Sequence, residues 1–169
     1  MKIDHSEARQ GTPLIPEGNY EGIIKYAGYK TTKGGTEYIG IDIVIRPDVD
    51  QDMQNEMIER PLWRRKNPTK ADQACGNFSA GEIQAVSKCA GMENGKEYES
   101  LEAWMKDLSN RLIKITVGHE IYKDKPQARV TWLSETEHPE CDIKYDIAEQ
   151  LFGDELSAFE PVNDAELPF

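Results

Sequence analysis

Alternating apolar and polar positions predict strands in the first half of the chain. The clearest run is 39–45, where four isoleucines alternate with Gly, Asp and Val, which places the isoleucines on one buried face. An earlier mixed run, 20–32, is separated from it by Lys-Gly-Gly-Thr at 33–36, and a Gly-Gly pair between two strand-like runs is a hairpin signal. A third run, 60–66, contains Pro61, which confines it to a strand start or a sheet edge.

The middle of the chain has the apolar spacing of helices. Ser79 and Glu82 have the separation of a capping box, and Gly91 suits the helix end. A second short helix is predicted after Ser100. The inner faces of these two helices would carry Ile83, Val86 and Ala90 in the first, and Leu101, Trp104 and Leu108 in the second.

Strand character returns at 111–120, where apolar residues again alternate, and at 128–133 after a turn at 123–126. Trp132 has a core spacing in the last of these runs, so we expect it to be structural, like Trp104. Beyond Pro139, the residues Ile143, Ile147 and Leu151 recur every four positions and predict a short amphipathic helix before a final disordered stretch.

The predicted order is three strands, a helical insertion and two strands. That order matches the OB-fold, a five-stranded barrel that is used repeatedly for single-stranded nucleic acids. We therefore expect a mainly β protein with three parts: an N-terminal arm (1–17), an OB-fold barrel with helices between its third and fourth strands (18–134), and an acidic C-terminal segment (135–169). Strand order alone does not determine function.

The charge is divided unevenly along the chain. The net charge is −11, but the part up to Leu133 holds 20 acids and 19 bases, whereas the part from Ser134 holds 11 acids and the single base Lys144. An acidic interaction tail on a nearly neutral domain explains this, so the low pI does not exclude nucleic acid. Three scattered cysteines, no apolar span and no signal-peptide pattern predict a reduced, soluble, cytoplasmic protein that does not enter a membrane.

A protein that holds single strands without reading their sequence needs cations along the phosphates and aromatic rings on which bases stack. The segment 60–70 supplies five bases and no acid, with Trp63 among them. If Leu62 points into the core, alternation places Trp63 and Arg65 on the outer face. The alternative is that Trp63 belongs to the core and the bases only solvate an edge. The candidates here are Trp63, Arg64, Arg65 and Lys66.

Two further patches are candidates. On the first hairpin, parity places Ile24 and Tyr26 inward if Lys25 and Tyr29 face outward, and it places Tyr38 outward too. With Lys30 and Lys33, these outward residues form an aromatic and basic patch at the hairpin. The turn between the last two strands, a binding loop in OB-folds, offers Tyr122, Lys123, Lys125 and Arg129. The alternatives are that the tyrosines only pack and that the turn lysines are only solvated.

The sequence offers little support for a metal-binding site or a catalytic site. His138 and Cys141 could supply two zinc ligands, with Cys75 and Cys89 in reach only through folding, but no CxxC pair exists. The chain has no phosphate-cradling glycine loop, no GxSxG and no HExxH motif. We therefore predict no metal, no cofactor and no enzymatic activity.

The last residues are a short apolar group that follows acids, and an exposed aromatic side chain there would insert into a pocket of another protein. The alternative is that the terminal Phe occurs there by chance. The tip consists of Asp164, Glu166, Leu167, Pro168 and Phe169. With the strand order and the basic Trp63 segment, it makes the chain resemble a family of phage and prophage single-stranded DNA-binding proteins. The opening Pro16-Glu-Gly-Asn-Tyr20-Glu-Gly also matches, and the similarity covers roughly 14–134 plus the tip. The tip departs from the family in having fewer consecutive acids.

The resemblance implies a non-catalytic protein that coats single-stranded DNA during phage-type replication and recombination in the bacterial cytoplasm. Its tail would recruit replication and recombination proteins, with the charged chain end captured by a basic pocket. Two alternatives remain open: a single-strand annealing or recombination mediator, and an acidic DNA mimic that inhibits a host nuclease. The oligomeric state is also open, a homo-oligomer included.

Overall fold

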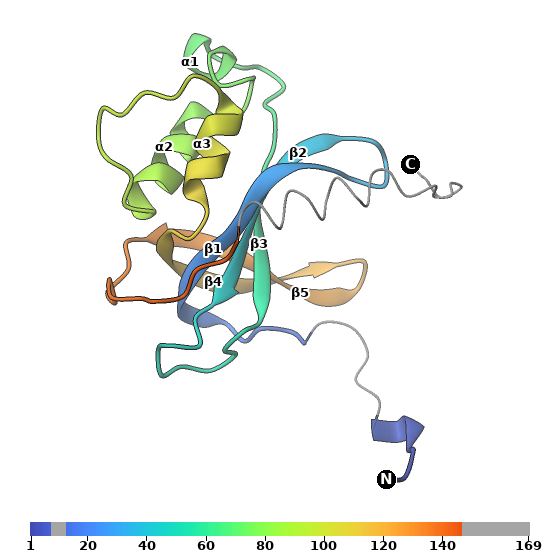
Figure 1. The fold of residues 1–169 in the computed structure, drawn as a ribbon. Coiled ribbons are helices and arrows are strands. Elements are labelled where there is room, and N and C mark those ends of the chain that lie inside the picture. Colours follow the sequence, from blue (N-terminus) through green and yellow to red (C-terminus); the bar gives the residue numbers. More distant parts are fainter. Residues whose placement is uncertain (8–12, 147–169) are drawn as a thin grey trace.

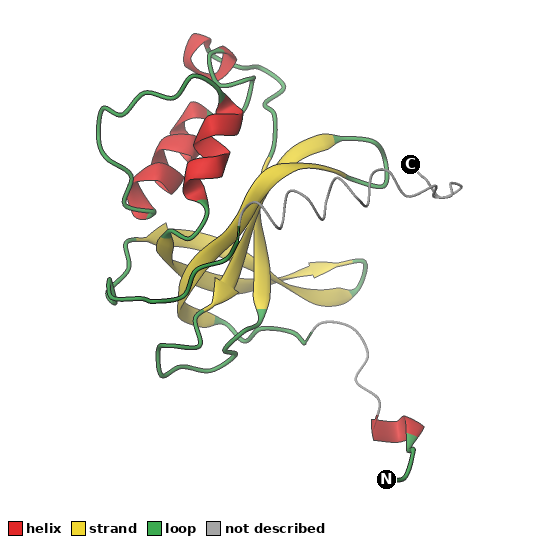
Figure 2. Ribbon diagram, viewed as in Figure 1, coloured by secondary structure: helices red, strands yellow, loops and turns green. Residues whose placement is uncertain are grey.

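The computed structural model describes residues 1–7 and 13–146. Within these described residues, a short 3-10 helix, η1, precedes five strands and three α-helices (Figures 1 and 2). In chain order they are η1 (His5–Glu7), β1 (Gly18–Thr31), β2 (Glu37–Ile45), β3 (Met57–Leu62), α1 (Lys70–Gln73), α2 (Ala80–Cys89), α3 (Leu101–Leu108), β4 (Leu112–Tyr122) and β5 (Lys125–Ser134). The protein is mainly β, as predicted.

The five strands form one antiparallel sheet in the order β3-β2-β1-β4-β5. The sheet is strongly bent, so that Cα atoms of its two edge strands, β3 and β5, come within 8 Å of each other (Figure 1). No backbone ladder joins these two edges in the described residues, so the predicted barrel is not closed. Pro61 lies on an edge strand, β3, as predicted.

The predicted alternation holds along β2 and β4. The four isoleucines of β2 are at most 1% exposed, and Ile113, Ile115 and Val117 of β4 are at most 2% exposed. The β1–β2 hairpin turns at Gly35, whose φ of 90° a side chain would disfavour. The β4–β5 turn is tighter than predicted: Lys123 and Asp124 both have positive φ, as in a type I′ turn, and β5 begins at Lys125.

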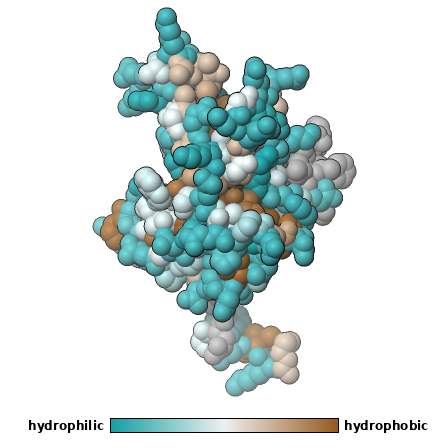
Figure 3. All heavy atoms as spheres, turned by 90° about the vertical axis from the view of Figure 1, so that its left-hand side faces the viewer, coloured by the Kyte–Doolittle hydropathy of each residue, from teal (hydrophilic) through white to brown (hydrophobic). Residues whose placement is uncertain are grey.

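The helices between β3 and β4 pack on one end of the sheet (Figure 1). Ser79 and Ser100 cap α2 and α3 by accepting the backbone N–H three residues on, and Gly91 follows α2 in the left-handed conformation. Trp104 is buried, as predicted. On the face shown in Figure 3, hydrophilic side chains predominate, and apolar ones gather in the lower half, over the sheet.

A bulge in β1 overturns part of the inward and outward assignment made for that strand: Ile24 is buried as predicted, but Tyr26 and Tyr29 depart from the assignment. The register with β2 shifts between Ile24 and Tyr26, so Ile23 and Ile24 are both fully buried while Tyr26 is only half-buried. Tyr29, predicted to face outward, is also half-buried and packs against Phe78, with ring centroids 6.4 Å apart. Strict alternation cannot continue through an inserted residue.

The first part of the acidic segment, 135–146, is bound to the sheet. The guanidinium of Arg46, which is fully buried, donates to the carbonyl oxygens of His138 (2.7 Å) and Glu140 (2.9 Å). Further along, the Asn110 amide exchanges hydrogen bonds of 2.9 and 2.6 Å with the backbone of Tyr145. Of the predicted amphipathic helix, residues 143–146 are not helical, and the remainder lies outside the described residues.

No helix among the described residues is long and apolar enough to cross a membrane.

Candidate nucleic-acid interface

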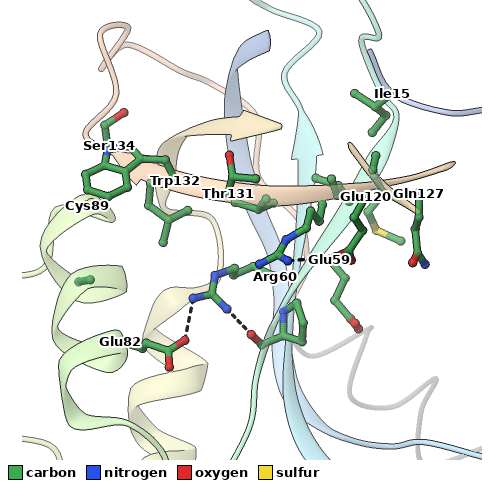
Figure 4. Close-up of a pocket in the computed structure, with 18 of the residues that line it drawn as sticks. Ile15, Glu59, Arg60, Glu82, Cys89, Glu120, Gln127, Thr131, Trp132 and Ser134 are labelled. Carbon is green, nitrogen blue, oxygen red and sulfur yellow. Dashed lines mark hydrogen bonds and ion pairs between the residues drawn. The ribbon is translucent and has the colours of Figure 1, made fainter. Parts of the chain in front are cut away.

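The open seam between the edge strands is a groove of ≈ 1410 Å³, here called the β3–β5 groove (Figure 4). Strands β3 and β5 form its two sides, α2 lies across one end, and the N-terminal arm reaches the other end at Leu14 and Ile15. Ile15 is buried there, and its carbonyl oxygen lies 2.7 Å from Nε2 of His119. Among the described residues, those with aromatic rings that line the groove are Tyr38, Trp63 and Trp132.

On the β3 side, Trp63 stacks on Tyr38. The ring centroids lie 4.5 Å apart at an interplanar angle of 29°. Trp63 is 46% exposed, which confirms that it faces outward while Leu62, 1% exposed, faces the core. Burial and the neighbouring Glu59 raise the pKa of the Tyr38 phenol, whose hydroxyl donates to the Glu59 carboxylate at 3.2 Å. The indole therefore has a fixed orientation, with the rest of its surface available.

On the β5 side, Trp132 is 70% exposed, so the core position that its spacing predicted was wrong. A bulge explains the error. Val117 pairs with Val130 but Thr116 pairs with Trp132, so the register shifts at Thr131 and Trp132 leaves the buried face that Val130 occupies. The alternating pattern of the sequence does not indicate the bulge, so the exposure of Trp132 could not be predicted from it.

The arginines of the groove are paired with acids. Arg60 reaches from β3 to Glu82 on α2, with Nη2 2.7 Å from Oε1 (Figure 4). Arg129 lies 3.1 Å from Glu120. Neither guanidinium is a free positive charge. Lys88 also lines the groove, is exposed, and has no acidic partner among the described residues.

Lys30, a predicted DNA contact, is held by carboxylates. Its Nζ lies 2.6 Å from Asp42 and 2.7 Å from Glu59. Burial opposes the charge, but the hydrogen bonds to the two acids outweigh it and raise the pKa of the ammonium. Lys30 therefore fixes Glu59, which in turn accepts from Tyr38, and it supports the aromatic pair instead of offering a free cation.

The basic segment after β3 is partly structural. Arg64 pairs with Glu37 at 2.8 Å and lies over the Phe78 ring, 4.6 Å from its centroid. Arg65 lies 3.3 Å from the buried Asp72, whose carboxylate caps α1. Lys66 is exposed, without an acidic partner in the part of the chain that the structure describes.

The remaining candidates lie outside the lining of the groove. Lys25 is the inserted residue of the β1 bulge and lies over the Tyr145 ring at 5.4 Å. The two hairpin turns are exposed. They carry Lys33 on the β1–β2 side, and Tyr122, Lys123 and Lys125 on the β4–β5 side. Of the thirteen predicted residues, the structure gathers Tyr38, Trp63 and Arg129 in the groove, and it adds Trp132, Arg60 and Lys88.

The other predicted sites remain untested by the structure. The three cysteines are free, and no group of three or more His, Cys, Asp or Glu side chains suited to a metal ion occurs among the described residues. The predicted tip, Asp164, Glu166 and Leu167 to Phe169, lies outside those residues.

Comparison with known proteins gives one family and a weak structural similarity. No curated protein matches the chain. A chain from a solved structure described as "Yeast RPA bound to ssDNA" is 10% identical, with 90% of this chain and 92% of that chain covered, at a TM-score of 0.30. A TM-score this low does not establish a shared fold. A family model described as "Protein of unknown function (DUF669)" matches residues 1–138, and the chain therefore belongs to that family.

Proposed function

We propose that the protein binds single-stranded DNA, without catalysis, in the β3–β5 groove. The observation that carries this proposal is the position of Trp63 and Trp132, which line the same groove from opposite sides and are 46% and 70% exposed. Large exposed aromatic side chains mark binding surfaces, and indole rings are sequence-tolerant platforms for bases. The groove is open, so a strand can enter it sideways.

Cations around the groove would take the phosphates. Exposed lysines without an acidic partner among the described residues include Lys33, Lys66, Lys88 and Lys125. They lie on the two hairpin turns, on the segment after β3 and on α2, so a strand stacked on the tryptophans would have positive charge on several sides. The bent five-stranded sheet would then act as a partly open OB-type barrel.

The biological role we propose follows the resemblance of the sequence. The protein would coat single strands exposed during phage-type replication or recombination in a bacterial cell. The tip around Leu167, Pro168 and Phe169 would recruit processing proteins, as an apolar anchor among acids.

Titration with oligo-dT, followed by tryptophan emission, tests the proposal. Stacking on the two exposed indoles should quench most of their emission, while the buried Trp104 supplies an unquenched background. The binding constant should fall with salt, with a log–log slope of about −0.7 for each phosphate contact. Absence of binding at every salt concentration would refute the proposal and favour the DNA-mimic hypothesis. Binding by assemblies larger than a tetramer would favour the annealing hypothesis.

A further inference from the structure

Arg60 occupies an unusual position on the inner face of β3. Ile58 and Leu62, two residues to either side, point into the core and are 8% and 1% exposed. Arg60 shares their parity, yet its side chain turns into the open seam and remains 23% exposed. An inward-pointing charge on an edge strand prevents pairing with another strand, and here it helps to keep β3 apart from β5. The same placement directs a guanidinium into the groove.

Helix α2 presents one of its faces to the same groove. Glu82, Ala85, Lys88 and Cys89 all line it, and the steps from Glu82 to Ala85 (three residues) and from Ala85 to Lys88 and Cys89 (three and four) are those of one helical face. Trp132 lies beside the end of this helix that carries Cys89 (Figure 4). The helical insertion therefore forms a wall of the groove, next to one of its two exposed tryptophans.

The ion pair between Arg60 and Glu82 connects strand β3 to helix α2. Arg60 Nη2 lies 2.7 Å from Glu82 Oε1, and Nη1 donates to the Pro61 carbonyl oxygen. The Glu82 side chain is 46% exposed, so its carboxylate can return to water at little cost when another anion takes its place. A phosphate oxyanion is such an anion, because a guanidinium can bind it through two parallel hydrogen bonds.

We propose that Arg60 and Lys88 form a phosphate subsite on the helical wall, and that Glu82 is its exchangeable counter-ion. The proposal rests on the proposed function, and its ligand is the phosphodiester backbone of the strand that stacks on Trp63 and Trp132. Glu82 neutralises Arg60 in the free protein and leaves it when a phosphate arrives. The carboxylate therefore limits affinity and discriminates against weak polyanions.

Two neutral substitutions test the subsite in the full-length protein. Glu82→Gln removes the charge, and glutamine at the third position of a helix still suits its cap. It should tighten oligo-dT binding about two- to fivefold at low salt, which corresponds to the free energy of an exposed ion pair. Lys88→Gln should weaken binding and reduce the log–log salt slope by about 0.7, the loss of one phosphate contact.

The matched controls lie away from the groove. Glu97→Gln and Lys106→Gln make the same charge changes at exposed positions that do not line it. Thermal unfolding verifies that all four variants are folded. If the wild type binds oligo-dT but Glu82→Gln and Lys88→Gln behave like their controls, the subsite is refuted and the groove is not. If the wild type itself does not bind, the proposed function fails and the subsite fails with it.

Discussion

The indole ring of Trp63 stacks on the phenol ring of Tyr38 with a centroid separation of 4.5 Å. The stack ends a chain of contacts: Tyr38 donates to Glu59, and Glu59 is held by Lys30 at 2.7 Å. Two of the predicted DNA contacts, Tyr38 and Lys30, thus help to hold the Trp63 ring in place. A stacking platform fixed in this way loses little conformational freedom when a base lies on it, which favours binding.

Replacing Trp63 should weaken DNA binding more than any change outside the groove. Because stacking on an aromatic side chain is worth about 1–3 kcal/mol per base, Trp63→Ala should raise the dissociation constant for oligo-dT about 5- to 150-fold. Ile121→Ala is the matched control, since Ile121 is 71% exposed and does not line the groove. Equal effects of the two substitutions in a fluorescence titration would contradict a role for Trp63.

Replacing Trp132 separates a binding role from a structural one. At 70% exposure, Trp132→Ala should change the free energy of unfolding by no more than about 0.5 kcal/mol, whereas a core tryptophan would cost about 3–5 kcal/mol. The same variant should bind oligo-dT more weakly. Urea denaturation and the titration together give both numbers, and a large loss of stability would restore the structural interpretation that alternation favoured.

The sheet was predictable where one physical rule acts alone. In β2, alternation and burial agree, so the four isoleucines placed the strand and its inner face correctly. At the bulges near Tyr26 and Trp132, an inserted residue exchanges the inward and outward positions of the strand. No residue type at these places indicates a bulge. The outcome depends on pairing with a neighbouring strand, which a local pattern does not contain.

The candidate site was predictable in part for a related reason. The segment around Trp63 stands out by composition, but composition does not say which charges are free. Arg64 and Arg65 face Glu37 and Asp72 only because the fold brings β2 and α1 beside them. The groove itself arises where β3 and β5 fail to pair, and that is a property of the assembled sheet.

Removing the end of the acidic tail should expose the cations of the groove. Residues 160–169 carry Glu160, Asp164 and Glu166, which can compete with phosphates for the same lysines. We expect the truncated protein to bind oligo-dT more tightly at low salt, with the difference vanishing as salt screens the charges. Unchanged or weaker binding at low salt would rule out this competition.

Gly22 is needed for the close approach of the central strands. A Cβ at this position would lie 2.5 Å from Cγ2 of Ile43 and 3.4 Å from the carbonyl oxygen of Ile113. Gly22→Ala should therefore cost about 1–3 kcal/mol of unfolding free energy through overpacking. Gly34→Ala, at the tip of the first hairpin, is the control because its Cβ would meet only the Thr32 side chain at 3.8 Å. A similar denaturation midpoint for both variants would contradict the account.

The buried Arg46 makes stability depend on an ionised Asp48. Two nitrogens of the guanidinium donate to the Asp48 carboxylate at 2.9 and 2.8 Å, and these bonds lower the pKa of that carboxyl from its ordinary value of 3.8. A lowered pKa in the folded state means that the unfolded chain binds the proton more readily. The contribution to stability is therefore complete above the ordinary pKa and is lost as the pH falls through the folded value.

Asp48→Asn should remove this contribution. The Asp48 side chain is 29% exposed while that of Arg46 is fully buried, so we expect a loss of about 2 kcal/mol at neutral pH, less than for a wholly buried pair. The stabilities of variant and wild type should converge as the pH falls below 3.8, because the unfolded wild-type chain then binds the proton, and the folded carboxylate binds it only at lower pH. Urea denaturation from pH 7 to pH 3 measures both curves. Asp50→Asn, an exposed position without an ion pair among the described residues, should leave the curve unchanged. Parallel curves for Asp48→Asn and the wild type would show that the ionisation of Asp48 does not stabilise the fold.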